Sequence, residues 1–106
     1  MLKENKLPAV HPGQILKKTV LPALGLSVTA AAKALGISRQ MLHGILSAKN
    51  PMSAEMSLRV ARLAGGDAET WMRLQSMYDL KKATHDKALM SRVRKIPPMR
   101  AQDVHA

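Results

Sequence analysis

The sequence predicts an all-α protein of five helices with a flexible N-terminal arm and a C-terminal tail. The strict alternation of apolar and polar residues that marks a half-buried strand is absent, and the many Ala, Leu, Met and Lys residues favour helices. The 106 residues are enough for one modest core. We therefore expect a single domain at residues 11–90, an arm at residues 1–10 and a basic tail at residues 91–106.

The first helix is predicted from Pro12 to Leu21. Pro12 suits a first helical turn, because its missing N–H would have no intrahelical partner there. Pro22 and Gly25 are expected to end the helix. Helical spacing places Ile15, Leu16, Val20 and Leu24 on the inner face and Lys17 and Lys18 on the outer face.

Two short helices follow, joined by the three residues "GIS". Ser27 is a good N-cap for the helix "VTAAAKAL", which Gly36 ends, and Ser38 caps a third helix that runs to Ser47. The residues of this pair that we expect in the core are Ala31, Ala32, Leu35, Leu42, Ile45 and Leu46.

A fourth and a fifth helix complete the predicted domain. Ser53 begins the fourth helix and Gly65 ends it, while Asp67 caps the fifth, which we expect to reach Lys82 or Arg94. The apolar residues that share one face of these helices are Met56, Val60, Leu63, Trp71, Leu74 and Tyr78. The last three are predicted either to join the core or to form the interface of a homodimer.

The charge distribution favours a polyanionic partner. Lys and Arg number 17 against 7 Asp and Glu, which gives a formal net charge of +10. No Asp or Glu occurs from Asn5 to Ala54, so the first half of the chain should attract a polyanion most strongly. A nucleic acid and an acidic membrane surface both fit this charge, and we favour nucleic acid.

Several classes of protein are disfavoured by the composition. The chain has no Cys, which excludes a disulfide scaffold and a thiolate metal site. No apolar run approaches the roughly 20 residues of a membrane-spanning helix, and the N-terminus lacks the apolar core of a secretory signal. We therefore expect a cytoplasmic, nucleoid-associated protein that does not contact a membrane.

The segment at residues 27–47 has the features of a helix-turn-helix, in which the second helix enters the major groove of DNA. Ala32 permits a close approach of the two helices, Gly36 allows the sharp turn, and Ile37 fills the angle between them. Such a motif needs one apolar side to fix the second helix and one polar side to contact DNA.

The polar side of the second helix supplies candidate base-reading residues. If its apolar residues point inward, the outward strip is Arg39, Gln40, His43, Gly44 and Ser47. Arg39 would pair with guanine and Gln40 with adenine, while His43 would reach a base or a phosphate. The predicted base-reading set is thus Arg39, Gln40, His43 and Gly44.

Candidate phosphate contacts lie at the helix ends. Hydroxyls, backbone N–H groups and an ammonium group can bind phosphate oxygens there and fix the position of the protein on the duplex. The residues of this kind are Ser27, Ser38, Ser47, Lys49 and Asn50.

The segments "HPGQILKKTVLPALGLS", "AAKALGISRQMLHGIL", "MSAEMSLRVARLAGG" and "TWMRLQSMYDL" together resemble the HigA-type, or VapI-like, antitoxins. These belong to the phage-repressor-like (XRE) helix-turn-helix proteins. The resemblance covers residues 11–80 and implies a small all-helical antitoxin, usually dimeric. Such a protein binds double-stranded operator DNA, represses its own operon and neutralises a cognate HigB-type ribonuclease toxin.

Three positions depart from the pattern of this family. Val28 stands where a Gln that contacts phosphate is common, Gly44 stands where an Arg is common, and "SAK" at residues 47–49 replaces the usual "NGK". Gly44 removes a side chain from the predicted strip and costs about 1 kcal/mol in helix propensity relative to Ala. These differences bear on DNA affinity and sequence choice.

Other functions remain open from the sequence alone. The chain would also fit a helix-turn-helix repressor without a toxin partner, or a protein-interaction module with weakened DNA binding. A histidine-dependent ribonuclease is disfavoured, because His11, His43, His85 and His105 lie in separate segments and form no metal-binding spacing. We predict no enzymatic activity and no catalytic, metal-binding or cofactor-binding residue.

Overall fold

The computed structural model describes residues 9–100, and within this range every regular element is helical. The first helix is continuous but consists of three parts: α1 (Pro12–Ile15), η1 (Leu16–Val20) and α2 (Leu21–Leu24). The later helices are α3 (Val28–Leu35), α4 (Arg39–Leu46), α5 (Ala54–Ala64), α6 (Ala68–Thr84) and α7 (Lys87–Arg94). The all-α prediction is therefore confirmed.

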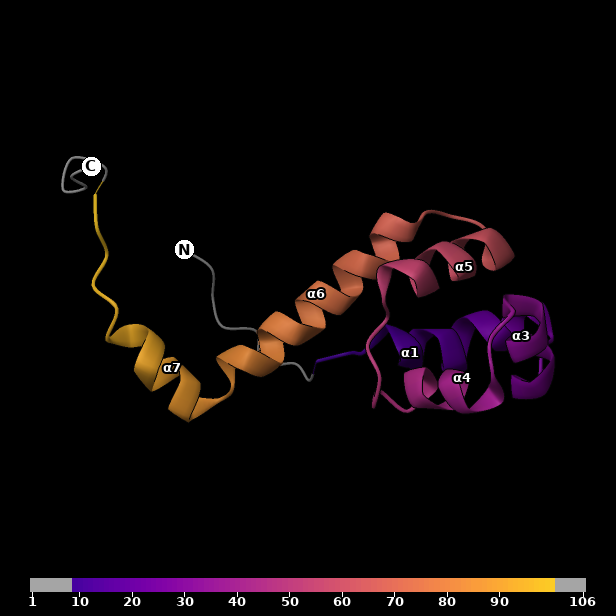
Figure 1. Cartoon of the computed structure of the whole chain (residues 1–106), viewed down its shortest axis with the longest axis horizontal. Coiled ribbons are helices and arrows are strands. Elements are labelled where there is room, and N and C mark those ends of the chain that lie inside the picture. Colours follow the sequence, from indigo (N-terminus) through magenta and orange to yellow (C-terminus); the bar gives the residue numbers. More distant parts are fainter. Residues whose placement is uncertain (1–8, 101–106) are drawn as a thin grey trace.

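The helices form a compact bundle with a projecting C-terminal part (Figure 1). Helices α1 to α5 gather at one end of the molecule, and α6 begins beside α5 and runs away from the bundle, so that α7 lies at a distance from it. The longest dimension of the described Cα atoms is consequently 56 Å, against 31 and 25 Å in the other two directions.

The first helix differs from its prediction at its C-terminal end. It continues past Leu21 through Pro22 and ends at Gly25, which has a left-handed φ of 67°. The N–H of Leu21 donates to the carbonyl oxygen of Leu16, five residues back, and this widened turn accommodates the ring of Pro22 without ending the helix. It also places Leu21 in the core, whereas Leu24, predicted to point inward, is 42% exposed.

The two helices of the predicted helix-turn-helix begin and end as the sequence indicates. The Ser27 hydroxyl oxygen accepts a hydrogen bond from the N–H of Ala30 at 3.1 Å, and that of Ser38 accepts one from Met41 at 3.0 Å. Gly36 ends α3 in a left-handed conformation. The predicted core residues of this pair are all buried: Ala31, Ala32, Leu35, Leu42, Ile45 and Leu46.

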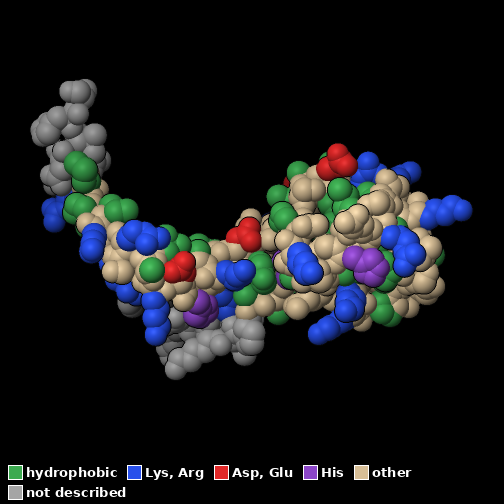
Figure 2. Space-filling model, turned by 60° about the horizontal axis from the view of Figure 1, so that its bottom comes forward, with side chains coloured by type: hydrophobic (Ala, Val, Ile, Leu, Met, Phe, Trp, Pro, Cys, Tyr) green, Lys and Arg blue, Asp and Glu red, His purple; other side chains and the backbone are tan. Residues whose placement is uncertain are grey.

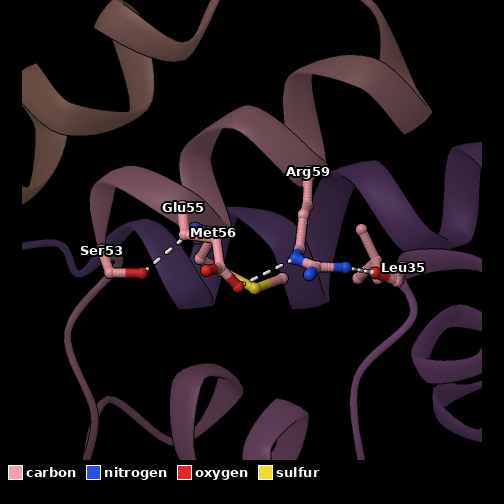
Figure 3. A network of polar contacts seen from close by, with 5 residues as sticks. All are labelled: Leu35, Ser53, Glu55, Met56 and Arg59. Carbon is pink, nitrogen blue, oxygen red and sulfur yellow. Dashed lines mark hydrogen bonds and ion pairs between the residues drawn. The ribbon is translucent and has the colours of Figure 1, made fainter.

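Helix α5 is tied to the end of α3 by Arg59 (Figure 3). The Arg59 Nη1 donates to the carbonyl oxygen of Leu35 at 2.8 Å, and its Nε donates to the carboxylate of Glu55 at 3.1 Å. The predicted N-cap Ser53 accepts from the N–H of Met56 at 3.1 Å. A guanidinium group at the end of α3 suits the negative pole of that helix, and it fixes α5 against the helix-turn-helix.

Helix α6 ends at Thr84, between the two ends that the sequence predicted. The chain then breaks at His85, and Asp86 caps a separate helix, its carboxylate accepting from the N–H of Leu89 at 3.0 Å. The five-helix prediction thus missed α7 as an element of its own. This helix extends to Arg94, beyond the predicted domain limit at residue 90, and none of its residues is buried.

No single helix among the described residues has the length and apolar character needed to cross a membrane. The segments 12–24 and 28–35 would meet that test only as a pair, by length and composition, and they are bent by 94°. Their most apolar side chains, including Leu16, Leu21 and Ala31, are buried in the bundle. The apolar content of this pair therefore serves the core of the protein.

Candidate nucleic-acid interface

Helix α4 presents a polar face away from the bundle. Its inner face carries Leu42, Ile45 and Leu46, of which none is more than 5% exposed. On the opposite side Arg39, Gln40, His43 and Ser47 are exposed, as the helical spacing predicted. The side chains that a major groove could contact are therefore held on a helix whose other face is fixed in the core.

A polar hollow lies on this outer face, at the C-terminal end of α4. Its volume is about 490 Å³, and it is lined by Gln40, His43, Gly44, Ser47, Lys49 and Asn50. The structure thus brings together six of the nine residues predicted to contact DNA. The other three, Arg39, Ser27 and Ser38, lie at the N-terminal ends of α3 and α4, where the serines act as caps.

The loop that follows α4 folds back on the end of that helix. The backbone N–H groups of Lys49 and Asn50 both donate to the carbonyl oxygen of Gly44, at 2.9 and 3.0 Å. The Ser47 hydroxyl donates to the same oxygen at 3.3 Å. Ala48 permits the reversal of the chain with a left-handed φ of 64°, a conformation that glycine adopts with less strain.

Gly44 makes room for the side chain of Asn50. A Cβ atom at residue 44 would overlap the Asn50 amide nitrogen and lie 2.9 Å from its Cγ. Gly44 itself can therefore present only backbone to DNA. The amide of Asn50 occupies the position on the outward strip where a side chain at residue 44 would begin.

A second close approach fixes the first helix to α4. A Cβ atom at Gly13 would overlap the carbonyl oxygen of Ile45, so only glycine permits this contact between α1 and the end of α4. His11 caps α1, with its Nδ1 accepting a hydrogen bond from the N–H of Gly13 at 2.9 Å. The backbone around Gly13 thus supports the C-terminal end of α4 from inside the bundle.

His11 also contacts α6 and the loop. It is 1% exposed, it is hydrogen-bonded to the backbone of Asn50, and its ring lies edge-on to Tyr78 at 4.8 Å between centroids. Burial lowers the pKa of His11 below its ordinary 6.5; the carboxylate of Asp79 and the bond to Asn50 oppose this shift, and the ammonium of Lys82 adds to it. A neutral ring with an unprotonated Nδ1 fits the bond from Gly13.

Gln75 fixes the loop from α6. Its Oε1 accepts a hydrogen bond from the N–H of Met52 at 2.7 Å, and its Nε2 donates to the carboxylate of Asp79 at 2.9 Å. Both Gln75 and Met52 are buried. The sequence analysis did not predict that Gln75 and His11 hold the loop after α4. Both residues lie in segments that carried the family resemblance, "LQSMYDL" and "HPG".

The three residues predicted for a dimer interface lie on the inner side of α6. Trp71 is 9% exposed, Leu74 packs against the core, and Tyr78 is half-buried against His11. The apolar side chains that α6 exposes are different ones: Met72, Met77 and Leu80.

Basic side chains are scattered over the surface of the bundle. Figure 2 shows Lys and Arg side chains spread over the bundle and along the C-terminal helices, with few Asp or Glu side chains between them.

Among the described residues no group of three or more His, Asp or Glu side chains could hold a metal ion.

Helix α3 packed on the core through Ala31, Ala32 and Leu35, a turn at Gly36 and helix α4 with an exposed polar face define a helix-turn-helix protein. No family model matches the chain. Virulence-associated protein I of Dichelobacter nodosus is 43% identical over 84 residues, which are 79% of this chain and 78% of that protein. The chain belongs to the HigA and virulence-associated protein I family of antitoxins.

The solved structures that this chain resembles include antitoxins of the same family. The Pseudomonas aeruginosa antitoxin HigA with its higBA promoter is 33% identical with a TM-score of 0.76, over 87% of this chain and 99% of that one. Antitoxin GraA in complex with its operator is 30% identical with a TM-score of 0.82, over 95% and 100%. Both proteins are antitoxins, which agrees with the prediction that the chain is not an enzyme.

Proposed function

We propose that this protein is a DNA-binding antitoxin that represses its own operon. The observation that supports it most is the outer face of α4, where Arg39, Gln40 and His43 are exposed on a helix held firmly by the core. Two similar proteins, HigA and GraA, have structures with promoter or operator DNA. We assign the bases to Arg39, Gln40 and His43, and phosphates to Ser27, Ser38, Ser47 and Lys49.

A homodimer would place two copies of α4 on a palindromic operator. Because Trp71, Leu74 and Tyr78 face the bundle, the apolar residues that α6 offers to a second copy are those on its opposite side, Met72, Met77 and Leu80. Sedimentation of the wild type and of Met77→Gln tests this part. A dimer weakened by the substitution, with helical content unchanged, supports an interface on α6, and a monomeric wild type contradicts it.

The footprint of the protein on the DNA upstream of its own reading frame tests the repressor role. We expect two protected half-sites whose centres lie about 34 Å apart, or a multiple of this, because α4 of each protomer enters the major groove on the same side of the duplex. A footprint without half-sites, or protection of any DNA supplied, would contradict the proposal.

The proposed partner in the second role is a HigB-type ribonuclease toxin, and the proposed location is the cytoplasm, at the nucleoid. Family membership supports this assignment. Co-expression with the product of the neighbouring gene tests it. We expect growth arrest by that product alone, rescue by the antitoxin and a complex that co-purifies; a helix-turn-helix repressor without a toxin partner would give neither arrest nor complex.

A further inference from the structure

The outward strip of α4 has a gap at Gly44, and a side chain from the following loop fills it. The amide group of Asn50 lies where a Cβ of residue 44 would stand. It lines the same hollow as Gln40 and His43. Asn50 therefore belongs to the strip in space, although it lies outside α4 in the sequence.

The side-chain amide of Asn50 makes no hydrogen bond with another described residue, while its backbone is fixed on both sides. The backbone N–H donates to Gly44, and a second backbone bond joins the residue to His11. Pro51 restricts the backbone of Asn50 further, and Gln75 holds the next residue, Met52. An unpaired amide on a fixed backbone suits bidentate recognition of a base.

We propose that Asn50 is a base-reading residue that takes the place of the side chain missing at Gly44. Adenine is the expected base, because an amide pairs with its N6 and N7 in the major groove. His11 and Gln75 act as positioning residues, since they hold the backbone that carries the amide. This proposal rests on the proposed DNA binding and changes the phosphate contact that the sequence predicted for Asn50 into a contact with a base.

A set of operator duplexes with each base pair replaced in turn separates a base contact from a phosphate contact. We expect Asn50→Ala to lose its preference at one base pair of each half-site, by about 10-fold, while the preferences at all other positions stay as in the wild type. Lys49→Ala is the matched control from the same loop. It should weaken binding to every duplex equally and lower the salt dependence.

Three results distinguish the two proposals. An unchanged preference profile in Asn50→Ala, or an equal loss on every duplex, overturns the base-reading role of Asn50. A wild type that shows no preference at any base pair overturns the proposed function instead. Circular dichroism of each variant confirms that the compared proteins are folded.

A double variant tests the exchange between the two positions. In Gly44→Gln combined with Asn50→Gly, the space vacated by the amide accepts a side chain from α4. We expect a base preference to return at the position that Asn50→Ala loses, and its absence there contradicts the proposal. His11→Asn keeps a capping side chain for α1 but removes the ring beside Asn50, so the preference at that same base pair should fall while the others persist.

Discussion

The two ends of this molecule differ in how far their apolar side chains are buried. In the bundle, the inward-facing residues of α3 and α4 are at most 5% exposed, and two glycines permit contacts at the end of α4 that a Cβ would prevent. In the C-terminal part, α7 buries none of its residues, and Ile96 and Met99 are 69% and 66% exposed. The bundle therefore fixes α4 in place, whereas the apolar side chains of the C-terminal part stay exposed in the single chain.

The substitution that we expect to change the free energy of unfolding most is at Gly13, where α1 packs on α4. Gly13→Ala should destabilise the protein by about 3 kcal/mol, because the added Cβ overlaps the backbone of Ile45, which cannot move without shifting α4. Chemical denaturation measures this change. Gly25→Ala is the control, since no atom lies within 4 Å of its Cβ and only the left-handed φ of 67° opposes it, at about 1 kcal/mol.

The next effect tests the link between α6 and the loop. Gln75→Met preserves the length of the side chain but leaves the buried N–H of Met52 without an acceptor, which should cost about 2 kcal/mol. Gln14→Met, at an exposed position of α1, should change the free energy of unfolding by less than about 0.5 kcal/mol. Equal effects of the two substitutions would show that Gln75 does not support the loop.

The stability of the bundle should depend on pH through His11. Burial lowers its pKa below 6.5 in the folded state, so the unfolded chain takes up a proton first and stability falls as the pH drops below about 6.5. Thermal unfolding between pH 7.5 and 5 measures the change. His11→Asn should reduce this dependence, and a wild type with the same dependence as His11→Asn would contradict the assignment.

One substitution in the loop after α4 should increase the free energy of unfolding rather than lower it, by a small amount. Ala48→Gly should stabilise the protein by about 1 kcal/mol, because glycine adopts the left-handed φ of 64° without the steric cost that alanine bears. Thermal unfolding measures the gain. An unchanged unfolding temperature would mean that the left-handed φ at Ala48 costs the loop no stability.

Local signals in the sequence predicted most of the fold. Ser27, Gly36 and Ser38 set the limits of the two central helices through capping bonds that span four residues or fewer, so the sequence alone predicts them. The widened turn before Pro22 was missed, since a bond from Leu21 to Leu16 has no residue pattern of its own.

In the candidate site, too, the sequence predicted what depends on local pattern and missed what depends on contacts between distant segments. The outward face of α4 follows from helical periodicity, so Arg39, Gln40 and His43 could be selected from the sequence. The support of the loop depends on contacts between distant segments, such as that of Met52 with Gln75, 23 residues apart. The place of Asn50 beside Gly44 likewise depends on how the loop folds back, which no local pattern shows.

Sequence-specific DNA binding through α4 is tested by a fluorescence anisotropy titration over a range of salt concentrations. The wild type and Arg39→Ala are compared on the DNA upstream of the reading frame and on a scrambled duplex. We expect a sequence-specific complex that Arg39→Ala weakens by about 1 to 3 kcal/mol. Equal and steeply salt-dependent binding of both duplexes, unaffected in specificity by Arg39→Ala, would contradict this expectation, because the net charge alone would then explain the binding.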